Sequence, residues 1–153
     1  MATGNLPHVE ECTCLAVRQA ARHVTQFYDQ HLAPFSLRTT QFSILAKLKR
    51  RGPMTINMLA NELVMDRTTL GRNILPLERE GLIGIAPGRE DRRSKELRLT
   101  EAGIERLQAA RVGWSEAQTR FAAAFGKQRA AGLRTLLGEV SATDLPVASA
   151  AYG

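Results

Sequence analysis

The sequence predicts a mainly α-helical fold that carries one two-stranded β-hairpin. Three observations support this prediction. Apolar residues recur at three- and four-residue spacing over several long stretches. Aromatic residues make up only 5% of the chain, which suits helices built on Leu and Ala better than a β-sandwich. One alternating run, 95–99, follows a tip that contains Pro87 and Gly88. With 153 residues, the chain is long enough for one domain or for one domain plus a dimerisation arm.

The N-terminal third is predicted to form two helices. Residues 9–32 carry apolar side chains, from Val9 to Phe27, on one helical face, and Pro34 ends this helix. Thr39 or Thr40 can cap a second helix. Its apolar stripe ends at a basic segment that runs into Gly-Pro.

Two shorter helices follow and are joined by a tight turn. Thr55 is a good N-cap for a helix over 56–63, and Asp66 is a good N-cap for a longer helix that ends at Gly81. The carboxylate of Asp66 also suits the positive end of the helix dipole. Two helices joined by a three- or four-residue turn predict a helix-turn-helix.

The hairpin comes directly after this pair, so the region reads as a winged helix-turn-helix. Its strands are predicted over 82–86 and 95–99. A hairpin that only packs on a core does not need the positive charge seen here, whereas one that lies on a polyanion does. The chain has a net charge of +6, which favours a polyanionic partner. A solvated loop without a partner is the alternative. The basic side chains of this segment are Arg89, Arg92, Arg93, Lys95 and Arg98.

The C-terminal part is predicted to form a dimerisation region. Thr100 caps a long helix over 101–124, Gly126 breaks it, and a last helix spans 127–138. The first and last helices carry more apolar surface than a small winged domain can cover, so they need a partner. The predicted organisation is an N-terminal helix of the dimerisation region (1–36), a winged DNA-binding domain (37–100), C-terminal dimerisation helices (101–140) and a disordered tail (141–153).

Side chains at the start of the second helix of the helix-turn-helix suit base recognition. In this motif, the second helix enters the major groove and its N-terminal residues meet base edges. Arginine bonds guanine, asparagine bonds adenine, and a threonine methyl packs on thymine. Leu70, Ile74 and Leu77 lie on the opposite face and should anchor the helix to the core. The candidate reading residues are Arg67, Thr68, Thr69, Arg72 and Asn73.

Two motifs make the chain similar to a known family. Residues 91–103, DRRSKELRLTEAG, match the wing signature D-x-R-S-x-x-(apolar)-x-L-T-x-x-G, and residues 77–83, LEREGLI, match L-E-x-x-G-L-(apolar). Residues 37–103 resemble the MarR family of winged helix-turn-helix regulators. The resemblance implies a homodimer on a palindromic operator, usually a repressor. It also implies that Asp91 pairs with an arginine to shape the wing and that Arg93 reaches the minor groove, with Arg92 as a neighbour.

Members of this family usually release DNA when a small molecule, often an aromatic or phenolic acid, binds beside the winged domain. No motif marks that pocket. By position, the ligand-binding candidates are Arg22, His23, Phe27 and Phe42, with ordinary packing as the alternative.

The thiols suggest a different signal. In the organic-hydroperoxide-sensing branch of the family, a reactive cysteine lies near the start of the first helix, which corresponds to Cys14, and Tyr28 matches one of the tyrosines that hold the thiolate. Thr39 stands where the second tyrosine would be, so the match is incomplete. Cys12 and Cys14 are predicted on different faces of the helix, which would exclude a disulfide between them.

Other classes of protein lack support in the sequence. No nucleophile–base pair, paired carboxylates or glycine-rich phosphate loop is recognisable, so an enzyme is not expected. No metal or cofactor is expected either. No segment is apolar enough to span a membrane and no signal peptide is recognisable, so a cytoplasmic location is expected. A winged module that binds without sequence specificity remains an alternative, although the polar recognition helix argues against it.

Overall fold

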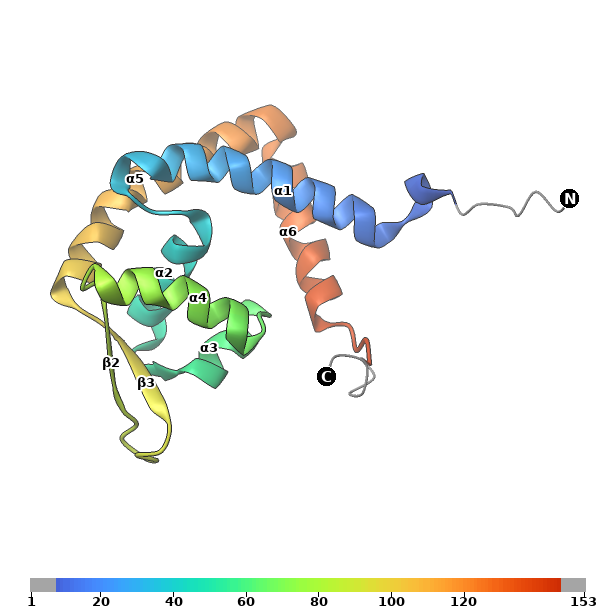
Figure 1. Cartoon of the computed structure of the whole chain (residues 1–153). Helices are drawn as coiled ribbons and strands as arrows, with labels where there is room; N and C mark the ends of the chain where they lie inside the picture. Colours follow the sequence, from blue (N-terminus) through green and yellow to red (C-terminus); the bar gives the residue numbers. More distant parts are fainter. Residues whose placement is uncertain (1–7, 147–153) are drawn as a thin grey trace, which may run out of the picture. The chain divides into compact units, whose positions relative to one another are not determined.

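The computed structural model describes residues 8–146, and the chain divides into two compact units between Ala117 and Gln118, inside its longest helix (Figure 1). The fold is mainly helical with a small antiparallel sheet, which confirms the predicted fold class. The elements are η1 (Val9–Glu11), α1 (Thr13–Leu32), η2 (Ala33–Phe35), α2 (Thr39–Arg51), β1 (Met54–Thr55), α3 (Ile56–Leu63), α4 (Arg67–Arg79), β2 (Ile83–Pro87), β3 (Lys95–Leu99), α5 (Glu101–Phe125) and α6 (Lys127–Ala142).

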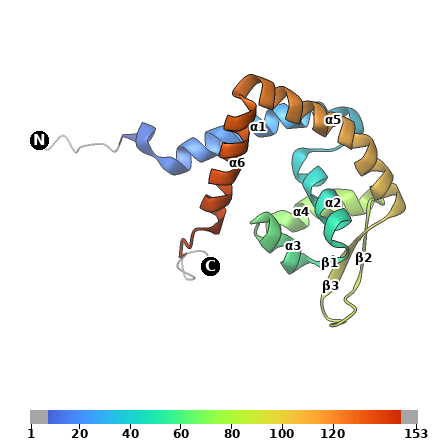
Figure 2. The same cartoon turned by 180° about the vertical axis from the view of Figure 1, so that it is seen from behind.

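The sheet has three strands and not the predicted two. Its order is β1-β3-β2, and both pairings are antiparallel (Figure 2). Met54 pairs with Leu97, and Ile83 pairs with Leu99. The strand β1 was missed because it has only two residues, too few to show an alternating pattern. It ties the start of α3 to the middle of β3.

One core lies within the first unit and fixes the helix-turn-helix. Leu70, Ile74 and Leu77 of α4 are each at most 2% exposed, which confirms that this face anchors the helix. They belong to one cluster with buried side chains of α2, α3 and the sheet, among them Ile44, Leu45, Leu48, Leu59 and Leu97.

Side-chain oxygens cap the helices of the winged region. Thr55 Oγ1 accepts a hydrogen bond from the Met58 N–H at 3.2 Å, and Asp66 Oδ1 accepts one from the Thr69 N–H at 2.8 Å, which confirms both predicted caps. The predicted cap of α2 by Thr39 or Thr40 is wrong. Thr39 is the first residue of α2, and its N–H and hydroxyl both donate to Asp29 Oδ1 at 2.7 Å.

The first helix begins later than predicted. The helix α1 starts at Thr13, and residues 9–11 form a separate 3₁₀ turn. Cys12 is the N-cap, with extended backbone, and its Sγ accepts a hydrogen bond from the Leu15 N–H at 3.4 Å. Since Cys12 lies outside the helix, the reason given for excluding a disulfide to Cys14 does not hold.

Two glycines let α5 approach neighbouring backbone closely. A Cβ at Gly103 would collide with the carbonyl oxygen of Leu82, at the start of the hairpin, and one at Gly113 would collide with the carbonyl oxygen of His31, near the end of α1. Larger residues at these positions would force α5 away from both elements.

In the second unit, α6 is longer than predicted. It runs to Ala142 instead of 138, so the first two residues of the predicted disordered tail are helical, and residues 147–153 lie outside the described part. The helix carries one apolar stripe, in which Leu133 is followed three, four and seven positions later by Leu136, Leu137 and Val140. Leu136 is 59% exposed, and the second unit itself therefore leaves this stripe open.

Candidate nucleic-acid interface

The N-terminal half of α4 presents the predicted reading side chains in two different states. Arg67, Thr68 and Arg72 are exposed, and no side-chain hydrogen bond or ion pair within residues 8–146 engages them. They are free to meet a duplex as donors. Arg72 lies within reach of a base edge if α4 enters the major groove.

The other two predicted readers are engaged within the helix. The Thr69 hydroxyl donates to Asp66 Oδ2 at 2.7 Å, so towards a base it can offer its methyl group and an acceptor oxygen but no donor. The Asn73 amide donates one N–H of Nδ2 to the Thr69 carbonyl oxygen at 2.9 Å, which leaves its other N–H and its Oδ1 to read adenine. These bonds order the helix face before DNA arrives.

The cap of α4 is also an electrostatic feature. The Thr69 hydroxyl and the Thr69 N–H both donate to the Asp66 carboxylate, and they lower the pKa of Asp66 from its usual value of 3.8. The carboxylate is therefore charged at neutral pH, where it complements the positive end of the helix dipole.

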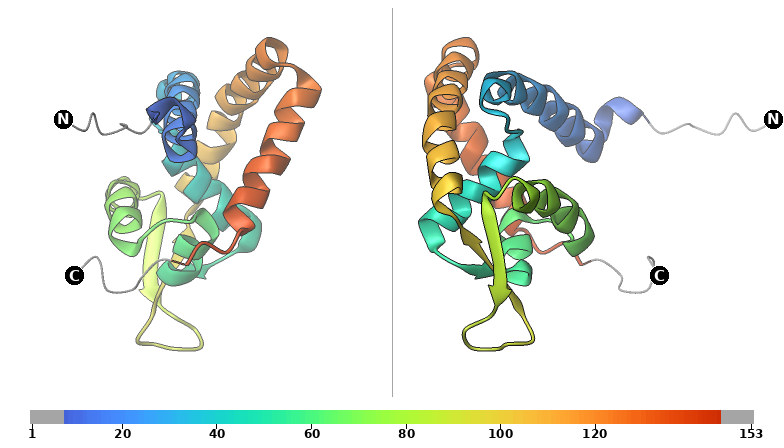
Figure 3. Two further views of the ribbon diagram at one scale, coloured as in Figure 1. Left: turned by 90° about the vertical axis from the view of Figure 1, so that its right-hand side faces the viewer. Right: turned by 60° about the vertical axis from the view of Figure 1, so that its left-hand side comes forward.

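The wing tip is shaped by Asp91 in a way the sequence did not predict. Asp91 Oδ1 accepts the Arg93 N–H at 2.9 Å, and the Asp91 carbonyl oxygen accepts the Ser94 hydroxyl at 2.7 Å. No ion pair between residues in the described range joins Asp91 to an arginine, so the expected pairing is replaced by a turn. The turn leaves Arg92 and Arg93 exposed at the tip, which extends beyond the helices of the first unit (Figure 3).

Glu96 is a wing residue that sequence reasoning missed. Its Oε2 accepts the Arg89 N–H at 3.2 Å, and its Oε1 lies 3.5 Å from Arg98 Nη2. The Glu96 side chain is only 13% exposed. In the sequence, Glu96 lies between Lys95 and Arg98, where a carboxylate is expected to be solvated. No sequence pattern therefore indicates that it bonds to the wing backbone.

The start of α4 and the wing converge on one open cavity, which contains Arg67, Arg93 and Lys95 among its lining residues. The predicted cations therefore come together in space, although Arg67 lies more than twenty positions before the wing tip. A polar recognition helix beside a cationic wing defines a winged helix-turn-helix that binds DNA.

Comparisons with known proteins agree with this class. The model of the MarR family matches residues 37–95. The HTH-type transcriptional regulator PecS of Dickeya dadantii is 30% identical over 115 residues, which cover 73% of this chain and 69% of PecS. The transcriptional regulator MosR of M. tuberculosis, solved in complex with DNA, is 35% identical with a TM-score of 0.75, over 88% of this chain and all of that one. The transcriptional repressor CouR, solved on a 23-mer DNA duplex, is 25% identical with a TM-score of 0.78, over 87% of this chain and 94% of that one.

The chain belongs to the MarR family. It is a DNA-binding transcriptional regulator and not an enzyme. None of the helices within residues 8–146 has the length and apolar character needed to cross a membrane. In the same range, no three or more His, Cys, Asp and Glu side chains gather as a metal site.

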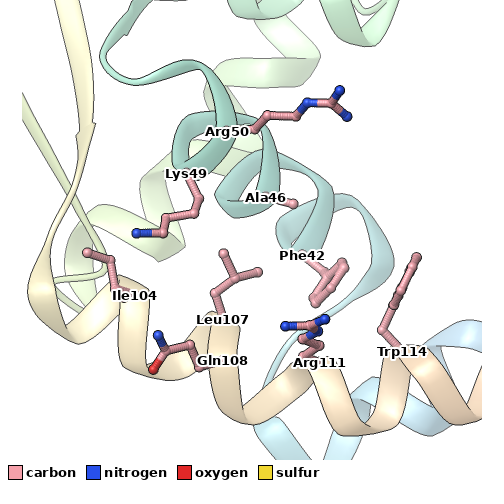
Figure 4. A pocket seen from close by; sticks show the side chains of 9 residues that line it. All are labelled: Phe42, Ala46, Lys49, Arg50, Ile104, Leu107, Gln108, Arg111 and Trp114. Atoms are coloured by element: carbon pink, nitrogen blue, oxygen red, sulfur yellow. The ribbon is translucent and has the colours of Figure 1, made fainter.

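An apolar cavity of about 380 Å³ lies between α2 and α5 (Figure 4). The Phe42 and Trp114 rings stack at one end with centroids 5.9 Å apart, and Leu107 projects from α5 toward α2. Its cationic side chains are Lys49, Arg50 and Arg111, of which Arg50 points away from α5. The remaining lining residues are Ala46, Ile104 and Gln108.

The predicted ligand residues are not brought together at this cavity. Only Phe42 lines it. Arg22 and His23 are exposed on α1, and Phe27 packs against His31, with ring centroids 4.7 Å apart. The cavity was missed because its cations come from the basic end of α2 and from the middle of α5, segments that sequence reasoning treated as a helix stop and a dimerisation helix.

The candidate redox residues also lie apart within one chain. Cys14 is exposed, whereas Tyr28 is half-buried and meets Phe27 edge to face. Fourteen residues of helix separate them, a rise of about 21 Å. Tyr28 can therefore contact Cys14 only if it comes from a second copy of the chain.

Proposed function

We propose that this protein is a homodimeric repressor that binds a palindromic operator and is released by an anionic aromatic ligand. The observation that carries the dimer is the apolar stripe of α6, whose residues Leu136, Leu137 and Val140 are 59%, 41% and 45% exposed. An exposed apolar stripe does not stabilise a monomer, but it would be buried in a dimer. A two-fold dimer also presents two winged regions to two inverted half-sites. The description of CouR as a repressor supports repression.

The cavity between α2 and α5 supports the response to a ligand. Its volume of about 380 Å³ falls within the range of small-molecule sites, and its apolar lining with a few charged groups matches their usual chemistry. Stacked Phe42 and Trp114 suit an aromatic ring, and Lys49 and Arg111 suit a carboxylate. A ligand held between α2 and α5 would bias the position of the helix-turn-helix, because α2 packs directly on α4.

Binding to DNA from its own upstream region tests the regulator directly. We expect the protein to prefer this operator over a scrambled duplex by about a thousandfold or more. Equal affinity for both duplexes would mean a winged module without sequence specificity.

Arg93→Ala tests the wing. We expect weaker binding and a flatter salt dependence, because a contact in the negatively charged minor groove is lost. Wild-type affinity and salt dependence in this variant would mean that the wing does not contact DNA.

A thiol-based sensor of organic hydroperoxides is the second candidate. Cys12 and Cys14 are both exposed at the start of α1, and Cys12 caps that helix. A hydroperoxide would convert the Cys14 thiol to a sulfenic acid and leave as the alcohol, and a second thiol would then form a disulfide and release water. We expect peroxide to release DNA from the wild type but not from Cys14→Ser. Equal release, or none, in the two proteins would remove this candidate and leave the cavity as the site of the signal.

A further inference from the structure

An open cavity of about 470 Å³ lies where the starts of α3 and α4 meet the wing, and neither the ligand response nor base reading explains it. Three separate segments of the first unit line it. Its lining residues are Thr55, Ile56, Asn57, Arg67, Asp91, Arg93, Ser94 and Lys95.

The charges around this cavity do not balance. Three cations, Arg67, Arg93 and Lys95, face one carboxylate, that of Asp91. No ion pair between side chains of residues 8–146 includes any of the three cations, and Asp91 is already engaged with the Arg93 N–H. Unpaired cations that share one cavity repel one another, so an anion between them would relieve this repulsion.

Neutral donors complete the site. Asn57 is exposed, and no hydrogen bond from residues 8–146 engages its amide. Thr55 Oγ1 accepts the Met58 N–H, which leaves the hydroxyl hydrogen free to donate. The Ser94 hydroxyl, by contrast, donates to the Asp91 carbonyl oxygen and is occupied. A tetrahedral anion, which accepts bonds from several directions, suits this set of donors better than a planar base edge does.

We propose that this cavity seats one phosphate of the DNA backbone, held jointly by Arg67 from α4 and Lys95 from β3. The inference rests on the DNA binding described above. It assigns to Arg67 a role that differs from the predicted one: Arg67 positions the duplex and does not read a base. As the first residue of α4, Arg67 lines the cavity beside the tip loop of the wing and the start of β3. Arg72 lies more than a turn later, outside the cavity, and is free to read a base.

Operator and scrambled duplexes separate the two roles of Arg67. A phosphate contact lowers affinity equally for all sequences, whereas a lost base contact relaxes specificity. We expect Arg67→Gln and Lys95→Gln each to weaken binding about tenfold on both duplexes. Arg72→Gln should weaken operator binding selectively. A selective loss in Arg67→Gln would overturn the proposal.

The salt dependence tests whether the two cations share one phosphate. We expect Arg67→Gln/Lys95→Gln to lower the slope of log K against log salt by about 0.9, the value for one phosphate, and to lose less affinity than the product of the single losses. A fall of about 1.8 with multiplying losses would mean two separate phosphates and would overturn the shared seat. Arg79→Gln, which removes an exposed cation at the other end of α4 and outside the cavity, is the matched control, and we expect it to leave the slope unchanged.

Neutral phosphate replacements locate the seat on the duplex. A series of operators, each with one methylphosphonate linkage, should contain one position per half-site that weakens the wild type and leaves the double variant unchanged. If every position affects both proteins alike, no seat exists. If the wild type binds no duplex at all, DNA binding itself fails, which is a different result. Thermal unfolding of each variant confirms that these exposed substitutions leave the fold intact.

Discussion

The winged region buries its large apolar side chains, whereas the two arms of the chain, α1 and α6, leave most of theirs exposed or half-buried. The largest fully buried side chains all lie between Leu32 and Leu97, within or next to the winged region. In contrast, Leu32 is the only buried residue of α1, and Ala130 is the only one of α6. The winged region therefore completes a core from its own chain, while α1 and α6 leave apolar side chains exposed.

The same contrast holds for the helix ends. Side-chain oxygens of Thr55 and Asp66 cap α3 and α4. A sulfur, a weaker acceptor, caps α1 at 3.4 Å, and α6 begins after Gly126 without a side-chain cap. The stronger caps thus lie in the winged region, and the proposed dimer would supply the stability that α1 and α6 lack. The consequence is that loss of the dimer and loss of the winged core should be separable by mutation.

The largest effect is expected from charging the α6 stripe. Leu136→Asp with Leu137→Asp places carboxylates on the surface that we propose as the dimer contact, where they would be buried without partners. We expect a monomer in sedimentation velocity and an affinity for the operator that falls by about a thousandfold, because one half-site alone supports little specific binding.

Val64→Asp provides the control for this prediction. Val64 is 75% exposed, in the turn between α3 and α4. We expect Val64→Asp to sediment as the wild type does. If the protein with Leu136→Asp and Leu137→Asp remained a dimer, the α6 stripe would not be the dimer contact.

A smaller effect is expected from truncations that compare the two regions directly. Leu70→Ala removes a fully buried side chain, and we expect a loss of about 2–5 kcal/mol in the free energy of unfolding. At high protein concentration, Leu137→Ala should lower the free energy of unfolding by less than Leu70→Ala does. At low concentration it should lower it by almost nothing, because the contact of Leu137 forms only in the dimer. Urea unfolding at two protein concentrations measures both. If both variants lost the same free energy of unfolding at both concentrations, α6 would be stabilised by its own chain as the winged region is, and the contrast between the two regions would be wrong.

The sequence predicted the helices of the winged region correctly but placed the start of α1 too early. Periodicity and caps located α3 and α4, since Thr55, Asp66 and Gly81 bound them with residues of strong local preference. The start of α1 was wrong because Val9 and Cys12 continue the apolar spacing of the helix although the backbone there has already left it. Spacing alone does not report where the helical hydrogen bonds begin.

The candidate sites show the same limit. The cations of the wing were found from their charge, but their convergence with Arg67 depends on the short strand β1, which docks the hairpin beside α3 through Met54 and Thr55. The apolar cavity needed Trp114 of α5 to stack on Phe42 of α2, a contact between segments seventy residues apart. Such long-range contacts leave no local pattern.

The smallest effect is expected from the caps, and it sharpens the comparison of helix ends. The Thr69 hydroxyl and N–H lower the pKa of Asp66 below 3.8 in the folded state. A carboxyl whose folded pKa is lowered contributes stability that is fully present above its unfolded value and is lost as the pH falls through the folded value. Asp66→Ala should therefore lower the unfolding temperature at pH 7, and this difference should shrink as the pH falls from 3.8 through the lower pKa of the folded state.

Two variants complete this test by thermal unfolding. Asp66→Asn keeps an oxygen acceptor that does not titrate, so its unfolding temperature relative to Asp66→Ala should not depend on pH. Cys12→Ala removes only the weak sulfur cap of α1, and we expect almost no change at either pH. If Cys12→Ala destabilised the protein as much as Asp66→Ala does, the N-terminal arm would be held by local bonds as firmly as the recognition helix, and its dependence on a second copy would lose its physical basis.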